Sequence, residues 1–360
     1  MIRHQSIEAM LAAYNDQAPL SEASTIPAPW YVDQRIAELE SLTVFSHAWQ
    51  VLGRADQVQK SGQFVTATVA DEPVFAVRGA DSQLRAFYNV CRHHAAKVVT
   101  EPCGSAAILH CPYHGWNYGL DGSLKGMPEF DGVKNFDRQE NGLVRIKVEI
   151  WESFVFVNLD LNAEPLTTFL GGLVKRCQPL ELAKLSFFGR KVYDIACNWK
   201  VFVDNYLDGG YHVPHLHKGL DRMLDYSEYQ IEPGDRSCLQ WSPLEGGGRA
   251  LYYWIYPNFM INRYPDAMDT NLVVPLGIDQ TEVIFDFYFN DISDGARERN
   301  LARIAVSESI QDEDVAICQS VQHGLSSRAY TAGRMSVRRE AGEHLFHRLL
   351  YRDLKSGLGN

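Results

Sequence analysis

The chain has 360 residues, of which 46% are hydrophobic and 22% charged, and its formal net charge is −11 at pH 7. The length exceeds one typical domain and suggests two, and the composition is ordinary for a globular protein. The acidic balance argues against nucleic acid or an anionic membrane surface as a partner.

No apolar run approaches the ~18 residues of a membrane span, and the N-terminal stretch lacks the apolar core and cleavage site of a signal peptide. These observations predict a cytoplasmic protein with no membrane association. The seven cysteines are an odd number spread over a long chain. A reducing compartment leaves such thiols free or bound to metal, so no disulfide scaffold is expected.

The first two parts of the chain differ in pattern. Residues 1–48 form an N-terminal segment with helical periodicity over 33–48, and we expect this segment to pack on the domain formed by residues 160–360. Residues 49–159 alternate apolar and polar positions in short runs that Gly, Asp and Pro interrupt. This pattern predicts a small all-β domain.

Residues 160–360 have a mixed pattern. A strand leads into a helix that must end by Pro214, and long strands follow between 248 and 290. Helical periodicity returns over 296–324 and again over 341–354. Strands combined with long helices predict an α+β fold for this domain.

Two short motifs lie at tight loops of the all-β domain. Cys91-x-His93 and Cys111-x2-His114 are separated by seventeen residues. Two thiolates and two imidazoles can bind one zinc ion tetrahedrally. The unequal gaps on adjacent loops suit instead a cluster in which two cysteines bind one iron and two histidines bind the other. The pattern resembles the Rieske proteins, which implies that these four residues bind a [2Fe–2S] cluster.

Two positions beside the ligand motifs indicate which branch of the Rieske proteins the chain resembles. Respiratory Rieske proteins brace their two ligand loops with a disulfide, and the corresponding positions here hold His94 and Tyr113. The absence of those cysteines resembles the oxygenase or ferredoxin branch of lower reduction potential. His94 and His110 lie off the ligand spacing, so we expect them beside the cluster or on the surface.

A second cluster follows about a hundred residues later. Asn205, Asp208 and His212 have the spacing i, i+3, i+7, which predicts one helical face. His217 could return from the turn after this helix and share a metal ion with His212. Two histidines and one carboxylate leave open positions on Fe(II) for dioxygen and substrate. Pairs that include His215 are open alternatives.

The carboxylate should come from the predicted helix over 296–324, where Asp312, Glu313 and Asp314 compete. Asp314 shares one helical stripe with Ile310, Ile317 and Val321. This stripe predicts that Asp314 faces inward while its two acidic neighbours face solvent.

The second cluster resembles the Rieske non-haem iron oxygenases, in which His-x4-His follows Asn-x2-Asp. The resemblance implies that His212, His217 and Asp314 bind the catalytic Fe(II), that O2 is a co-substrate, and that Asn205 and Asp208 belong to the catalytic machinery. It also implies that Asp208 links an iron-binding histidine to a Rieske histidine of a neighbouring subunit.

Other runs, such as "CRHHA", "YPNFMINRY" and "EDVAICQSVQHGL", are similar to the choline monooxygenase branch of this family. The similarity implies a helix-grip catalytic domain, meaning an antiparallel sheet that holds long helices, and a homotrimer. It also implies a separate ferredoxin or reductase as electron donor, since no nucleotide-binding pattern indicates a fused reductase.

The branch implies a small quaternary ammonium substrate, choline first, oxidised to the hydrate of betaine aldehyde. Such a cation accepts no hydrogen bond and is usually held over aromatic rings. Period-two alternation places Trp254, Tyr256, Asn258 and Asn262 on one strand face, and Tyr206 lies beside the iron-binding residues. The alternatives are sheet-core aromatics, an aromatic-ring hydroxylase, an N-demethylase of betaine-like or carnitine-like compounds, and an electron-transfer or sensor module.

Overall fold

The computed structural model describes residues 5–359 and contains two compact units. The first unit, Phe45–Phe169, carries the two motifs that resemble Rieske proteins and is called the Rieske unit below after that resemblance. The second joins the chain up to Val44 to the chain from Leu170 onward and is called the catalytic unit after the iron site that the sequence predicts there. The predicted boundaries fall after residues 48 and 159.

The Rieske unit is built on two antiparallel sheets. The larger sheet has the strand order β1-β10-β9-β4-β3-β2-β5, and the smaller has the order β6-β7-β8. The strands are β1 (Gln50–Arg54), β2 (Gln63–Val69), β3 (Glu72–Arg78), β4 (Leu84–Tyr88), β5 (Cys103–Ser105), β6 (Leu109–His110), β7 (Asn117–Tyr118), β8 (Leu124–Gly126), β9 (Arg145–Trp151) and β10 (Phe154–Asn158).

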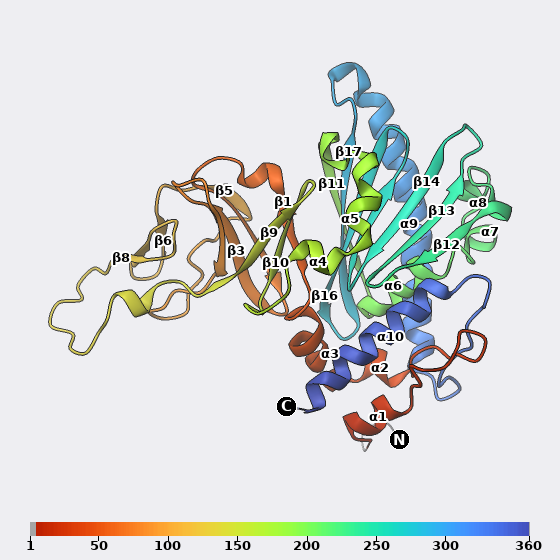
Figure 1. The fold of residues 1–360 in the computed structure, drawn as a ribbon, viewed down its shortest axis with the longest axis horizontal. Helices are drawn as coiled ribbons and strands as arrows, with labels where there is room; N and C mark the ends of the chain where they lie inside the picture. Colours follow the sequence, from red (N-terminus) through yellow and green to blue (C-terminus); the bar gives the residue numbers. More distant parts are fainter. Residues whose placement is uncertain (1–4, 360) are drawn as a thin grey trace. The chain divides into compact units, whose positions relative to one another are not determined.

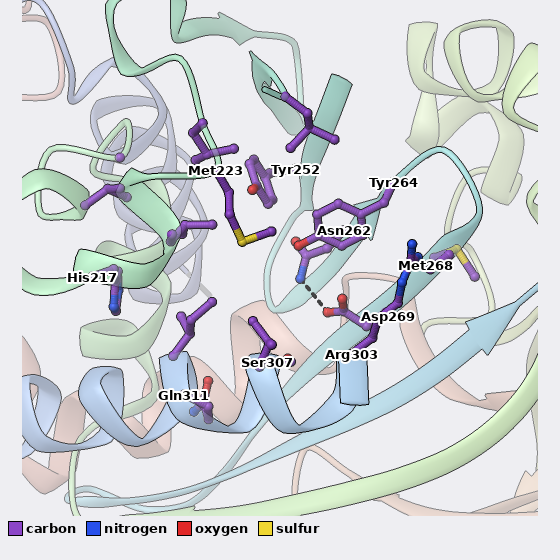
Figure 2. A pocket seen from close by; sticks show the side chains of 18 of the residues that line it. His217, Met223, Tyr252, Asn262, Tyr264, Met268, Asp269, Arg303, Ser307 and Gln311 are labelled. Atoms are coloured by element: carbon purple, nitrogen blue, oxygen red, sulfur yellow. Dashed lines mark hydrogen bonds between the residues drawn. The ribbon is translucent and has the colours of Figure 1, made fainter. Parts of the chain in front are cut away.

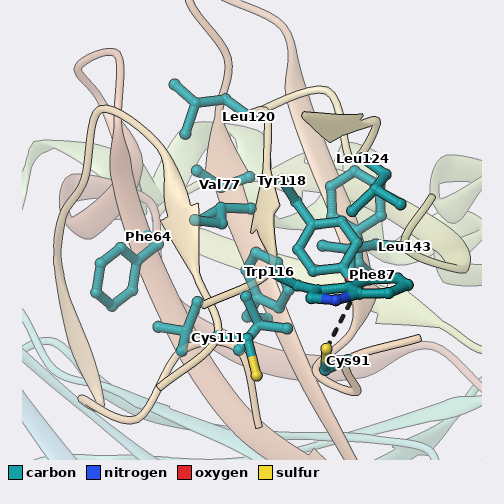
Figure 3. Packing of buried hydrophobic residues seen from close by; sticks show 14 residues of the cluster. Phe64, Val77, Phe87, Cys91, Cys111, Trp116, Tyr118, Leu120, Leu124 and Leu143 are labelled. Carbon is teal, nitrogen blue, oxygen red and sulfur yellow. Dashed lines mark hydrogen bonds between the residues drawn. The ribbon is translucent and has the colours of Figure 1, made fainter. Parts of the chain in front are cut away.

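An aromatic and aliphatic core joins the small sheet to the large one. Phe87 of β4, Tyr118 of β7 and Leu124 of β8 are buried together, and the same cluster includes Cys91 and Cys111. Figure 3 shows both thiols at the edge of this cluster rather than in its middle. The core therefore fixes the two cysteine-bearing loops on one rigid platform.

The catalytic unit holds a seven-stranded antiparallel sheet with the order β11-β17-β16-β15-β14-β13-β12. Its strands are β11 (Ser186–Ile195), β12 (Gln230–Pro233), β13 (Ser237–Pro243), β14 (Arg249–Ile255), β15 (Phe259–Arg263), β16 (Ala267–Gly277) and β17 (Gln280–Phe289). The helices α6 (Trp199–Leu207) and α9 (Arg297–Leu325) pack side by side, with α6 against β16 and α9 against β11 (Figure 1).

The remaining helices of the catalytic unit are shorter, apart from α10. They are α1 (Ile7–Ala12), α2 (Pro29–Val32), α3 (Gln34–Glu40), α5 (Gly172–Cys177), α7 (Val213–Leu216), α8 (Lys218–Asp221) and α10 (Ala341–Ser356), while α4 (Leu166–Leu170) spans the boundary between the units. Of the helices in residues 5–359, none combines the length and apolar character that crossing a bilayer requires.

A buried ion pair ties the N-terminal segment to α6. Lys200 Nζ lies 2.6 Å from Glu40 Oε1, and Trp199 Nε1 donates a hydrogen bond to the other oxygen of Glu40. Both charged side chains are almost completely buried. Either charge would be costly to bury alone, and the ion pair gives each its counter-charge. The N-terminal segment is therefore fastened to the helix that leads into the second histidine cluster.

The predicted α+β architecture, with an all-β domain and a helix-holding antiparallel sheet, is confirmed. The two late helices begin and end within two residues of their predicted bounds. The predicted helix over 33–48 is wrong in part, because α3 ends at Glu40 and a π-helical turn, Ser41–Phe45, follows it.

Candidate metal centres and active site

The two cysteine-bearing loops of the Rieske unit have the same backbone geometry. Cys91 N donates to Ala96 O and Ala95 N donates to Cys91 O. In the second loop, Cys111 makes the equivalent bonds with Trp116 and Gly115. The residues at positions 95 and 115 both have positive φ, 61° and 71°, which turns each loop back on itself.

The four predicted cluster ligands divide into a buried pair and a more exposed pair. Cys91 and Cys111 are 3% and 2% exposed, whereas His93 is half-buried and His114 is exposed. The two imidazole rings lie 4.8 Å apart between centroids, and the His93 ring stacks on Trp116. A cluster held here would have its cysteine side buried and its histidine side toward solvent.

The donor atoms fit an iron–sulfur cluster better than a single zinc ion. His93 Nδ1 is buried and has no hydrogen-bond partner among residues 5–359, so a bond to metal would satisfy it. The ligand atoms of His93, His94 and His114 lie within 4.8 Å of one another, but neither thiol joins that group. A tetrahedral zinc ion needs all four donors around one point, whereas a two-iron cluster separates them into pairs. Burial and the neighbouring Cys91 thiol raise the pKa of Cys111, so metal is needed to hold it as a thiolate.

The helix α6 ends before the second histidine cluster, at Leu207. Asp208 is its C-cap, and the chain then reverses through Gly209 and Gly210, whose φ angles are 71° and 66°. A Cβ on Gly209 would lie 2.1 Å from a backbone oxygen, so that position accepts only glycine. The prediction that Asp208 and His212 share a helical face with Asn205 is therefore wrong.

The proline that was expected to end the helix instead helps to start the next one. Pro214 lies in the first turn of α7, where its missing N–H costs nothing, and His212 is the N-cap of that helix. His217 is the C-cap of α7. The two histidines therefore flank one short helix, and their rings meet with centroids 4.8 Å apart.

The structure brings His212, His217 and Asp314 together. Their ligand atoms all lie within 4.8 Å of one another. Asp314 Oδ1 is 3.1 Å from His217 Nε2 and 3.9 Å from His212 Nε2. His215, the open alternative, is exposed. Two imidazoles and one carboxylate on one side of a metal ion match the donor set that non-haem Fe(II) takes.

Two carboxylates bond to the Nδ1 atoms of the two histidines and so orient the imidazole rings. Asp208 Oδ2 lies 2.6 Å from His212 Nδ1, and Glu313 Oε2 lies 2.6 Å from His217 Nδ1. Each contact fixes Nδ1 as the protonated nitrogen and leaves Nε2 free for metal. The sequence predicted that Glu313 faces solvent; its side chain is 41% exposed, but the prediction missed its bond to His217. Its position directly before a ligand was the only signal of its role.

Hydrogen bonds also hold Asp314, the predicted third ligand. Asn205 Nδ2 donates to Asp314 Oδ1 at 2.8 Å. Burial lowers the pKa of His217, but its hydrogen bonds with Asp314 and Glu313 outweigh burial and raise the pKa above its usual value. Asn205 therefore fixes the carboxylate that faces both histidines.

The reason given for choosing Asp314 differs from what the structure shows. Ile317 and Val321 are 37% and 43% exposed, so the predicted inward stripe is wrong. The buried stripe of α9 is instead a seven-residue repeat made by Ile304, Gln311, Cys318 and Leu325. Asp314 stands at the margin of this stripe and reaches His217 from there.

A cavity of about 710 Å³ opens onto these ligands. Figure 2 shows His217 on one side of it and Asp269 on the other, with Tyr252 and Tyr264 along the wall between them. The aromatic side chains that line the cavity are Phe202, Tyr206, Tyr229, Tyr252, Tyr264, Phe285, Phe287 and Phe289. The cavity lining is thus more apolar than polar, and its polar side chains include Asn262, Asp269 and Gln311.

Of the predicted substrate residues, Tyr206 and Asn262 line the cavity, whereas Trp254, Tyr256 and Asn258 do not. Trp254 is fully buried and donates its indole N–H to a backbone oxygen, and Tyr256 Oη donates to Asp353 of α10 at 2.6 Å. Alternation assigns a side chain to a face of the sheet but not to a position along it. Trp254 contacts Phe346 of α10 and Tyr256 bonds to Asp353 of the same helix, so both side chains are directed at α10 rather than into the cavity.

Asp208 gives a testable prediction. Asp208→Asn should leave both metal centres loaded, because Asp208 is not among the grouped ligand atoms. It should slow turnover by about tenfold or more, since the amide holds the His212 imidazole less firmly. Metal content and single-turnover rates measure the two effects. Asp312→Asn, an exposed neighbour of the ligand on α9, is the matched control. A wild-type rate in the Asp208 variant would remove it from the catalytic machinery.

Family models match both units. A Rieske [2Fe-2S] domain model matches residues 48–137, and a model of the ring hydroxylating alpha subunit catalytic domain matches 182–231 and 224–356. The first match covers both cysteine-bearing loops. The second covers both histidines and the carboxylate of the second centre.

Relatives and solved structures agree with these matches. The chain is 38% identical to the chloroplastic choline monooxygenase of Arabidopsis thaliana, over 97% of this chain and 87% of that protein. It is 30% identical to the carnitine monooxygenase oxygenase subunit of Escherichia coli (strain K12), over 86% of each.

A crystal structure of the quaternary ammonium Rieske monooxygenase CntA with gamma-butyrobetaine superposes with a TM-score of 0.84 at 29% identity, covering 97% of this chain and 99% of that one. Naphthalene 1,2-dioxygenase, at 18% identity and a TM-score of 0.78, shares the fold. The chain therefore belongs to the Rieske non-haem iron monooxygenases, in which a [2Fe–2S] domain serves a catalytic domain that binds a mononuclear iron.

Proposed function

We propose that this enzyme hydroxylates a small quaternary ammonium compound, with choline as the favoured substrate and betaine aldehyde, as its hydrate, as the product. The observation that carries the proposal is the cavity beside His212, His217 and Asp314, which is walled by tyrosine and phenylalanine rings. Aromatic faces attract a cation that can accept no hydrogen bond. The similarity to choline and carnitine monooxygenases supports the same substrate class.

Three groups of residues would hold the cluster, the iron and the substrate. When bound, the [2Fe–2S] cluster passes single electrons and the mononuclear Fe(II) activates O2 for C–H hydroxylation. Cys91, His93, Cys111 and His114 would hold the cluster, and His212, His217 and Asp314 would hold the iron. The aromatic wall holds the substrate and keeps water from the reacting carbon.

The source of the electrons and the assembly belong to the same proposal. The chain would receive electrons from a separate ferredoxin or reductase. It would work as a homotrimer in which Asp208 connects His212 to His114 of a neighbouring copy. The 2.6 Å contact between Asp208 Oδ2 and His212 Nδ1 within one chain supports this role for Asp208.

A second candidate is N-demethylation of a betaine-like or carnitine-like compound. Two arginines, Arg222 and Arg303, line the cavity and could face a substrate carboxylate. Arg303, however, is engaged by Asp266 in an ion pair. Choline has no carboxylate and needs neither arginine, which is why we favour it.

An O2-dependent turnover screen with a surrogate reductase tests the proposal. The substrates are choline, glycine betaine, carnitine, stachydrine and simple aromatics. We expect choline to give betaine aldehyde without formaldehyde, because the attack is on the hydroxymethyl carbon. Formaldehyde from a betaine-like compound would favour N-demethylation instead. Turnover of an aromatic ring with no reaction of any quaternary ammonium compound would overturn the proposed substrate class.

A further inference from the structure

Asp269 is a buried acid on a strand that is otherwise mostly apolar. It lies on β16, is 7% exposed, and lines the cavity on the side opposite His217 (Figure 2). Its register partner Asn262 donates to Asp269 Oδ1 at 2.7 Å, and Asn271 lies at 3.5 Å. Within residues 5–359, no lysine, arginine or histidine pairs with it.

Its environment leaves the negative charge of Asp269 without a counter-charge. Burial raises the pKa of Asp269 to about 7, although the hydrogen bonds from Asn262 and Asn271 oppose this effect. Buried carboxylates are ordinarily paired with a cation or bound to a metal. A ligand that carries a positive charge into the cavity would supply the missing partner.

The groups around Asp269 suit a cation that has no hydrogen-bond donors. Tyr206 Oη donates to Asn262 Oδ1 at 2.8 Å, so a chain of hydrogen bonds runs from α6 to Asp269. Burial raises the pKa values of Tyr252 and Tyr264, and the negative charge of Asp269 adds to this effect. Rings for the methyl groups and a carboxylate for the charge therefore meet in one part of the cavity.

The other ionisable groups near Asp269 do not neutralise it. Burial raises the pKa of Tyr193 of β11, and nearby acids including Asp269 add to this effect, so near neutral pH the surrounding tyrosines are uncharged. Arg303 of α9 lines the same cavity but is paired with Asp266. Asp269 is thus the buried negative charge that a substrate meets opposite the iron ligands.

We propose that Asp269 is the counter-charge that selects the substrate, so that a net cation binds in preference to its uncharged isostere or to a zwitterion. This inference rests on the proposed function, because it concerns the same cavity and the same substrate class. It assigns the charge preference to one carboxylate and the shape preference to the aromatic wall.

Equilibrium binding to the holoenzyme without O2 tests this proposal. Choline is compared with 3,3-dimethylbutanol, which keeps the shape and lacks the charge. In Asp269→Asn, choline affinity should fall about tenfold or more, or about 1.4 kcal/mol, while affinity for 3,3-dimethylbutanol should change less than about twofold. Asp312→Asn, the same substitution at an exposed position of α9 that does not line the cavity, should leave both affinities unchanged.

Proton release gives a second readout. A bound cation favours the ionised carboxylate, so the pKa of Asp269 falls in the complex and choline affinity rises as pH increases through about 7. At pH 7 the wild-type enzyme should release up to about half a proton per choline bound, measured by calorimetry in buffers of different ionisation enthalpy. Binding of 3,3-dimethylbutanol, and choline binding by Asp269→Asn, should release none from this site.

The outcomes separate the inference from the function on which it rests. If the wild type binds choline and Asp269→Asn binds it equally well, the counter-charge is wrong and the proposed function stands. Equal loss of both ligands in Asp269→Asn, with metal content intact, assigns Asp269 a structural role and overturns the inference. If the wild type binds no quaternary ammonium compound, both proposals fall.

Discussion

His217→Ala should lose the mononuclear iron and all oxygenation while keeping the Rieske spectrum. His217 is 1% exposed, and its Nε2 faces Asp314 while Glu313 holds Nδ1. Among the described residues, no imidazole besides His212 and His217 joins this group of ligand atoms, so nothing can replace the lost donor. We expect the same result for His212→Ala and Asp314→Ala.

The control for this prediction is His215→Ala. His215 is exposed and lies only two residues before His217, so its removal tests a nearby histidine that the structure leaves out of the site. It should retain one mononuclear iron and near-wild-type turnover. Iron analysis and the EPR spectrum of the reduced protein measure both centres in each variant. Loss of iron from His215→Ala with retention in His217→Ala would reverse the ligand assignment.

Cys91→Ser should abolish the visible absorption and the reduced-state EPR signal of the Rieske centre. The Cys91 thiol is buried beside Tyr118 Oη at 3.3 Å and has no substitute at the same position in the loop. His114→Ala should do the same from the exposed side of the cluster. Both variants should stop electron delivery and therefore all O2-dependent turnover.

A control for the Rieske variants is Cys103→Ser. Cys103 is the other cysteine of the Rieske unit, but it lies exposed on β5. Its replacement should leave the spectrum unchanged. A full spectrum in Cys91→Ser would mean that the cluster is bound elsewhere.

The predicted ligands of the second centre, His212, His217 and Asp314, lie close together in the structure, and spacing could indicate the two histidines because it is a local property. The two cysteine-bearing loops and the His-x4-His motif each lie within one short segment, so their spacing carries the geometry. Asp314 was selected correctly as a neighbour of both histidines but for a wrong reason, since the residues of its supposed stripe, Ile317 and Val321, are exposed. The path of the chain between Asp208 and His212 depends on two glycines with positive φ, which helical spacing does not reveal.

The substrate cavity was harder to predict because it depends on contacts between distant strands. Tyr206 and Asn262 were identified, but Asp269 was missed. An acid in the buried stretch "AMDTNLVV" was the available signal. Trp254 has the residue type that favours cation binding, yet its place under α10 is set by tertiary packing that alternation does not describe.

Iron and acid-labile sulfide content is the measurement that tests the central claim most directly. The two centres predict three irons and two sulfides per chain in protein purified without added metal, with two of the irons in the cluster and one on His212, His217 and Asp314. Two irons per chain would leave an electron-transfer protein without an oxygenase site. One zinc ion per chain with no sulfide would contradict the Rieske assignment.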